Sequence, residues 1–149
     1  MADNRLAHLG DYEQLFTLYR ELNPEDPIPD ERTRCAFERI LESPGLVIFV
    51  AESNRTLLAT CYLNIVPNLT RGAQPYALIE NVVTRATHRG QGLGKRLIRH
   101  VQEYAWSRGC YKIMLLTGSE EPATHAFYRA CGFSGDSKHG YIIHAPHSR

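Results

Sequence analysis

The sequence lacks long apolar runs and has no excess of either charge. No stretch of its 149 residues approaches the roughly 20 consecutive apolar residues that a membrane-spanning helix needs. Lys and Arg number 17 against 16 Asp and Glu, which leaves a net charge of +1. Because this balance creates no broad field of one sign and no basic aromatic face is evident, we expect neither a membrane nor nucleic acid as a partner.

Cysteine is scarce and scattered. The four cysteines form no CxxC pair and no dense framework, so the sequence predicts neither a disulfide scaffold nor a zinc site. We expect small buried apolar residues at all four positions, which are Cys35, Cys61, Cys110 and Cys131. His144 and His147 near the C-terminus lack further ligands, and we therefore predict no metal site.

No repeat, low-complexity stretch or long linker divides the chain. A globule of this length buries roughly two-thirds of the surface that its unfolded chain exposes, so we predict a single domain over residues 1–149 with one core. The opening MADNRLAHLG has no apolar segment behind a basic start. Without a secretory signal, we expect a cytoplasmic protein.

Apolar residues at helical spacing predict four helices. Asp11, with Gln14 three residues later, is typical of the start of a first amphipathic helix. Asp30 is placed to cap a second helix, which ends before Ser43. The other two helices are expected over residues 92–108 and 122–130.

Runs of β-branched and aromatic residues predict the strands. They cover residues 5–7, 46–51, 57–66, 76–84 and 111–116, and a final hairpin is expected from Phe133 onward with residues 141–144. Strands and helices alternate irregularly along the chain, which indicates the α+β class with a mixed sheet.

The strand expected over residues 76–84 contains a conflict. Its composition is that of a buried strand, but Glu80 and Asn81 stand in its middle. Local departures from a structural pattern concentrate at functional sites, so this pair is a candidate for chemistry.

The segment from residue 88 to residue 96 combines three glycines with several cations. It lies between a strand and a strongly periodic helix, so its backbone N–H groups and the positive helix end would converge on an anion. A phosphate-binding P-loop is excluded, because Arg89 and Arg96 stand where that motif needs Gly and Ser or Thr. The spacing of Gly90, Gly92 and Gly94 also fails the GxGxxG dinucleotide pattern. The alternative is a plain helix start, which three glycines close to Arg89, Lys95 and Arg96 would serve badly.

Two motifs resemble those of the GNAT superfamily of N-acetyltransferases. Arg89-x-x-Gly92-x-Gly94 is similar to the superfamily's Gln/Arg-x-x-Gly-x-Gly/Ala signature, and residues 126–133 resemble its FYxxxGF stretch. The order of elements also matches, and residues 5–7 resemble the first strand. The resemblance implies the GNAT fold, a single mixed, largely antiparallel sheet flanked by about four helices. It also implies transfer of acetyl from acetyl-CoA to the primary amine of a small molecule.

The resemblance assigns a binding role for acetyl-CoA to two segments. The backbone of Val82 and Val83 would pair with the pantetheine arm like an added strand. The pyrophosphate would be held by the turn that follows, comprising Arg89, Gly90, Gln91, Gly92, Leu93, Gly94 and Lys95.

Direct attack on the thioester requires a neutral amine. An alkylamine has a pKa near 10, so a base must remove its proton, directly or through water. Glu80 is the candidate, because partial desolvation in an apolar strand would raise its pKa, and similar acetyltransferases carry an acid here. The alternative is a structural Glu paired with a nearby cation. Asn81 is expected on the other strand face in a supporting role, and a backbone N–H near Val82 would donate to the oxyanion.

Tyr128 resembles the tyrosine that donates a proton to the departing CoA sulfur in this superfamily. The alternative is an aromatic core residue beside Phe127 and Phe133. Many members carry an Asn just before this tyrosine, but residues 120–125 contain none. Thr124 or His125 takes that place, or the contact is absent.

The acceptor stays open at this level. By resemblance it is held by residues 21–34 and 67–75, where Arg71 favours an anionic amine and several acids favour a cationic one. A protein lysine or N-terminus is an alternative acceptor, and a non-catalytic acetyl-CoA-binding module is an alternative function. Many GNAT proteins dimerise, which makes a homodimer possible.

Overall fold

The computed structural model describes residues 1–147, which form two compact units. The first unit comprises residues 1–115, and the second begins at Leu116. The domain predicted over residues 1–149 spans both units, and its last two residues lie outside the described range. Its unity stays a prediction. In the described part of the chain, no helix is long and apolar enough to cross a bilayer.

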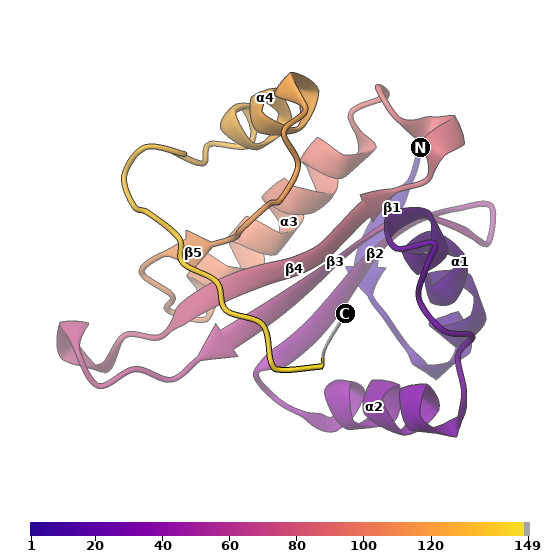
Figure 1. Cartoon of the computed structure of the whole chain (residues 1–149), viewed down its shortest axis with the longest axis horizontal. Coiled ribbons are helices and arrows are strands. Elements are labelled where there is room, and N and C mark those ends of the chain that lie inside the picture. Colours follow the sequence, from indigo (N-terminus) through magenta and orange to yellow (C-terminus); the bar gives the residue numbers. More distant parts are fainter. Residues whose placement is uncertain (148–149) are drawn as a thin grey trace. The chain divides into compact units, whose positions relative to one another are not determined.

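One five-stranded sheet organises the first unit, with the strands in the order β1-β2-β3-β4-β5 (Figure 1). Their bounds are Asp3–Leu6, Leu46–Ser53, Thr56–Val66, Tyr76–Thr84 and Ile113–Met114. All neighbours pair antiparallel except β4 and β5, which run parallel. This mixed, largely antiparallel sheet with four helices in the chain confirms the predicted fold class.

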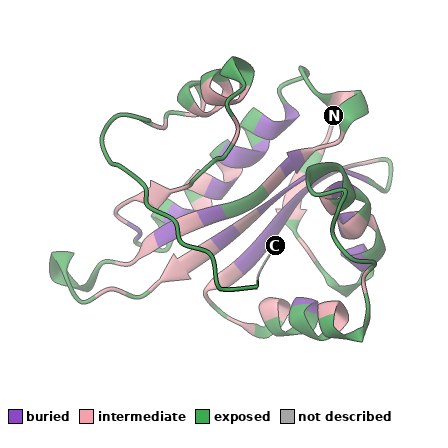
Figure 2. Cartoon of the chain, viewed as in Figure 1, coloured by how far each residue is buried: buried purple, intermediate pink, exposed green. Residues whose placement is uncertain are grey.

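Helices cover both faces of this sheet (Figure 1). α1 (Tyr12–Leu22) and α2 (Glu31–Glu42) pack on one face, and α3 (Leu93–Ser107) packs on the other. Alternation along β2 separates the two layers: Ile48 and Val50 join the α1 and α2 cluster, whereas Phe49 stacks edge-on against His100 and Tyr104 of α3. The central strands are accordingly the most buried part of the sheet (Figure 2).

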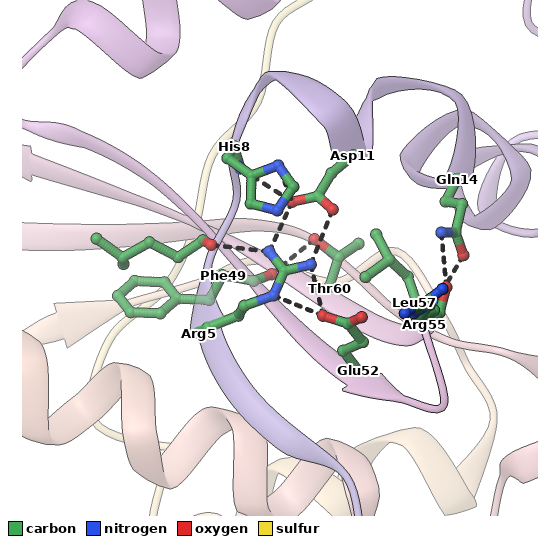
Figure 3. A network of polar contacts seen from close by, with 10 residues as sticks. Arg5, His8, Asp11, Gln14, Phe49, Glu52, Arg55, Leu57 and Thr60 are labelled. Carbon is green, nitrogen blue, oxygen red and sulfur yellow. Dashed lines mark hydrogen bonds and ion pairs between the residues drawn. The ribbon is translucent and has the colours of Figure 1, made fainter.

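Asp11 precedes α1 as predicted, but its carboxylate does not cap the helix. It accepts two hydrogen bonds from Arg5, at 2.7 and 2.9 Å, and one from the backbone N–H of His8 (Figure 3). Arg5 also donates to Glu52 at 2.7 Å. Burial alone would raise the pKa of Asp11, but the hydrogen bonds from Arg5 and His8 outweigh it and lower that pKa.

Gln14 also departs from the capping box that the sequence suggested. Its side-chain amide donates to the carbonyl of Arg55 and accepts from the N–H of Leu57, at 3.0 and 2.8 Å (Figure 3). It therefore joins α1 to the turn between β2 and β3.

The cysteines and the last strands differ from expectation. Cys61 and Cys110 are buried as predicted, Cys131 is half-buried and Cys35 is exposed. β5 is shorter than the predicted strand, because only Ala77 and Leu78 pair with it. The predicted final hairpin does not form among the described residues, where residues 141–145 adopt no regular structure. Three exposed apolar side chains lie there, Tyr141, Ile142 and Ile143.

Candidate active site

A β-bulge in β4 brings Glu80 and Asn81 to the surface together. Glu80 lies opposite Tyr62 and Val83 lies opposite Thr60, so Asn81 and Val82 share one position on β3. Asn81 supplies the bulge with a left-handed backbone, at φ 52°. Because the extra residue reverses the alternation, Glu80 and Val83 both face the α1 and α2 side.

This bulge corrects two expectations. Glu80 is exposed and not partly desolvated, because the bulge interrupts the buried run of the strand (Figure 2). Asn81, expected on the other strand face, is equally exposed and lines the cavity on the α1 and α2 side, while its supporting role stays a prediction. A polar pair inside an apolar strand was the signal for the irregularity, but the sequence alone does not say which residue bulges.

One edge of β4 is open beyond its first residues. β5 pairs only with Ala77 and Leu78, so within residues 1–115 no strand pairs with Val82 or Val83 on that side. The side chain of Val83 is buried in the α1 and α2 cluster, which fixes the backbone of this edge. An extended ligand with amide groups can add to such an edge as a strand does.

The turn over residues 85–92 joins this edge to α3. Gly90 and Gly92 have φ values of 76° and 75°, a left-handed conformation that glycine adopts without strain. Among the described residues no side chain caps α3, and no acid lies in its first turn. Lys95 and Arg96 follow in that first turn, next to backbone N–H groups that have no partner within the helix. This arrangement fits a phosphate-type anion.

Three groups hold the 85–92 turn in place. Arg85 donates from its guanidinium to the carbonyl of Leu57, at 3.2 and 3.0 Å. The carboxylate of Glu21 accepts from the N–H of Ala86 at 2.7 Å. Arg89 donates to the carbonyl of Thr84 at 3.1 Å.

A cavity of about 570 Å³ lies on the α1 and α2 side of the first unit. Its lining comes from α1, from the loop that connects it to α2, from the start of α2 and from Asn81 of β4. The aromatic rings of Phe16 and Tyr19 form part of its wall. A volume of this size suits a small organic molecule.

Some charged side chains that line this cavity are paired with each other, and others are not. Asp30 and Arg32 pair with each other at 2.9 Å. Within the described residues, Arg20 and Asp26 form no ion pair, so one cation and one anion of the lining remain available to a ligand. No group of three or more His, Cys, Asp or Glu residues in the described chain is arranged to hold a metal ion.

Tyr128 belongs to the second unit, on α4 (Pro122–Ala130). Its ring packs edge-on against Phe127 and Phe133, with centroids 5.1 and 6.2 Å apart. Thr124 accepts a hydrogen bond from the hydroxyl of Ser119. The ring of His125 lies within hydrogen-bond distance of the Ser119 carbonyl, at 2.8 Å. The catalytic role of Tyr128 stays a prediction.

β4 therefore presents an open edge that leads to an uncapped, cationic helix start. The chain belongs to the acetyltransferase (GNAT) family, whose model matches residues 12–133, and it is an N-acetyltransferase.

Several relatives support this assignment over most of the chain. A putative acetyltransferase from Agrobacterium tumefaciens shares 49% identity with a TM-score of 0.91, covering 96% of this chain and 99% of that one. Glucosamine 6-phosphate N-acetyltransferase 1 of rice is 35% identical over 87% of this chain and 79% of its own length. The structure of glucosamine-6-phosphate N-acetyltransferase from Arabidopsis thaliana has a TM-score of 0.83 at 26% identity, covering 96% of this chain and 98% of that one.

Proposed function

We propose that this protein transfers the acetyl group of acetyl-CoA to the primary amine of a small molecule. The observation that carries the proposal is the meeting of three features at β4 in the first unit. The strand has an open edge at Val82 and Val83, it leads into the uncapped start of α3, and its bulge reaches a cavity of small-molecule size. Relatives named as acetyltransferases of an amino sugar phosphate support the choice of acceptor class.

Acetyl-CoA would bind along this edge. The backbone of Val82 and Val83 would pair with the amides of the pantetheine arm. The pyrophosphate would accept hydrogen bonds at the turn and the helix start, from residues among Arg89, Gly90, Gln91, Gly92, Leu93, Gly94 and Lys95. The left-handed glycines and the missing cap support this placement.

The proposed chemistry is a direct displacement. Glu80 accepts a proton from the ammonium group, directly or through water, and the neutral nitrogen attacks the thioester carbon. A backbone N–H near Val82 stabilises the developing oxyanion. The C–S bond then breaks, and the departing thiolate takes a proton that Tyr128 donates. The nitrogen loses its second proton as the amide forms, and this proton restores Tyr128 through solvent. The amine becomes an amide, and CoA leaves as the free thiol.

The acceptor proposed here is an amine that also carries an anionic group. Two acids that would favour a purely cationic acceptor are already engaged, because Glu21 binds Ala86 and Asp30 caps α2. Arg20 is the cation that the cavity leaves available, and Asp26 is the corresponding anion. Arg20 would bind the acceptor's anionic group, while Asp26 would attract its ammonium group.

Two further expectations accompany this proposal. We place the reaction in the cytoplasm, where free thiols such as the four cysteines persist. We also propose a homodimer, supported by the exposed apolar run Tyr141, Ile142 and Ile143. Light scattering of the purified protein would measure its mass in solution; a strictly monomeric mass would refute the dimer.

The test follows thiol release from acetyl-CoA with a panel of amines: amino sugars and their phosphates, aminophosphonates, amino acids, polyamines and peptides. We expect turnover with a small anionic amine. The variant Glu80→Gln should lower kcat at neutral pH by about 100-fold with unchanged affinity for CoA. Glu38→Gln, at an exposed acid of α2, is the matched control and should keep the full rate.

Other outcomes would favour a different acceptor or a different function. Turnover of peptides alone would favour a protein lysine or N-terminus as the acceptor. Binding of acetyl-CoA without turnover of any amine would favour a non-catalytic binding module. A full rate in Glu80→Gln would remove Glu80 from the mechanism.

A further inference from the structure

Glu21, near the C-terminal end of α1, reaches across to the start of the 85–92 turn. Its carboxylate accepts the backbone N–H of Ala86 at 2.7 Å, across 65 residues of sequence. The same oxygen lies 3.8 Å from the guanidinium of Arg89. The Glu21 side chain is 27% exposed, whereas that of Arg89 is 59% exposed, so the acid is the more fixed member of this pair.

The hydrogen bond supplies a cap that the local sequence lacks. Ala86 begins the 3₁₀-helix Ala86–His88, and Arg85 at its N-cap position makes no capping hydrogen bond through its side chain. The first N–H groups of a helix have no partner within it. A carboxylate acceptor gives one of them a charge-assisted hydrogen bond, which is stronger than a neutral one.

The turn is therefore anchored to three different elements. Arg85 fastens its beginning to the carbonyl of Leu57 on β3, Glu21 fastens the next residue to α1, and Arg89 donates to the carbonyl of Thr84 on β4. Gly90 and Gly92 follow without side chains that could hold them. The conformation of the 85–92 turn consequently depends on these anchors.

We propose that Glu21 is a positioning residue for binding of the acetyl-CoA pyrophosphate. It acts through the backbone N–H of Ala86, by holding the 85–92 turn in the conformation that presents its N–H groups to the anion. This inference rests on the proposed function, and it adds a residue of α1 to a binding site otherwise made by β4 and α3.

Two substitutions separate the effect of the Glu21 hydrogen bond from the effect of its charge. Glu21→Ala removes both, and we expect the Kd for CoA to rise about 5- to 10-fold, in line with the loss of one charge-assisted hydrogen bond. Glu21→Gln keeps an acceptor oxygen for Ala86 and removes a negative charge from the neighbourhood of an anion. It should bind CoA within about twofold of wild type.

Kinetics with two different acetyl donors distinguish a loss of pyrophosphate binding from general destabilisation of the protein. S-acetylpantetheine carries the thioester and the arm but no pyrophosphate. Glu21→Ala should therefore raise the KM for acetyl-CoA and leave kcat and the KM for S-acetylpantetheine unchanged. Glu13→Ala, at an exposed acid of the same helix, is the matched control and should change neither donor.

A second variant keeps the test independent of folding defects. Ala86→Pro removes the N–H donor at a first helical position, where proline is tolerated, and the ψ of 130° at Arg85 is compatible with a following proline. In the Ala86→Pro background, Glu21→Ala should raise the Kd for CoA no further.

Calorimetric titration with CoA decides the outcome. If wild type binds CoA and Glu21→Ala binds it equally well, the inference is wrong while the proposed function stands. An equal loss with both donors would also overturn it, since the effect would then not concern the pyrophosphate. If wild type binds no CoA, the proposed function fails and this inference fails with it.

Discussion

The first backbone N–H groups of α2 and of α3 both need hydrogen-bond partners from outside the helix, and the two helix starts differ in how they are provided for. At α2, the Asp30 carboxylate accepts from the backbone N–H groups of Arg32 and Thr33, and the Thr33 hydroxyl accepts from the N–H of Asp30. At α3, left-handed Gly92 holds the cap position, and among the described residues no side chain caps the helix. The start of α2 is satisfied within the chain. The start of α3 has no such side-chain partner among the described residues, and we propose that an anion binds there.

The start of α1 is an instructive third case. It has an acid in the cap position, Asp11, but that carboxylate binds Arg5 and His8 and gives no capping hydrogen bond to α1. An acid before a helix can therefore serve tertiary structure. The first turn of α3 contains Lys95 and Arg96 and no acid, which supports the proposed anion site.

The largest effect is expected from placing an acid at the cap position of α3, as α2 has. Gly92→Asp places a carboxylate where the pyrophosphate is proposed to bind, and we expect the Kd for CoA to rise more than about 100-fold by repulsion and occupancy. The added Cβ would meet only the end of the Arg96 side chain, at 3.2 Å.

Gly92→Asn is its control, because it introduces the same backbone strain without charge. It should weaken CoA binding by no more than about 10-fold, the equivalent of roughly 1.4 kcal/mol of strain. Equal losses in the two variants, measured by calorimetry, would mean that strain and not charge governs the site.

The second prediction concerns the contribution of the ionised Asp11 carboxylate, just before α1, to the stability of the fold. Asp11 is 4% exposed, and its pKa is lowered in the folded protein. Its ionised form therefore stabilises the fold at neutral pH, and this contribution is lost as the pH falls below about 4 through the lower folded-state pKa. Asp11→Asn should lower the free energy of unfolding at pH 7 by about 2 kcal/mol.

Urea unfolding at several pH values measures both effects. The Asp11→Asn variant should lose less stability on acidification than wild type does. A variant with the same acid dependence as wild type would show that other carboxylates control it.

The third prediction concerns the cation in the first turn of α3. Lys95→Met should raise the Kd for CoA about fivefold and leave kcat unchanged, because it removes one charge from the anion site. Arg39→Met, at an exposed cation on α2, should leave the Kd unchanged in the same titration. A similar loss in both variants would assign the effect to net charge alone.

The smallest effect is expected at the satisfied helix. Asp30→Ala should lower the melting temperature by a few degrees through loss of the cap and leave the Kd for CoA unchanged. Thermal unfolding and calorimetry together check this. Weakened CoA binding would erase the distinction between the two helix starts.

Local chemistry is what the sequence predicts well. The glycines before α3 and the cap at Asp30 are short-range signals, and both helices begin within a residue of the expected position. Asp11 and Gln14 show the same pattern as a capping box, but their partners Arg5 and Leu57 come from other elements. The spacing of residues along the sequence does not reveal whether a side chain will bind a local partner or one from another element.

The shape of the site depends on register, which no single segment contains. The bulge at Asn81 follows from how β3 and β4 align, and it places Glu80 in the open although its strand is apolar. The contact of Glu21 with Ala86 likewise joins residues far apart in sequence. The motif around Gly92 predicted a binding turn, but not the residue on α1 that holds it.

The central claim is that CoA binds with its pyrophosphate at the 85–92 turn and the start of α3. Titrating isotope-labelled protein with CoA and, separately, with pantetheine while recording the backbone amide signals tests it directly. We expect CoA to shift the amides of residues 90–95 together with those of Val82 and Val83, and pantetheine to shift only the strand amides. If CoA leaves residues 90–95 unmoved or shifts another surface, the account is contradicted.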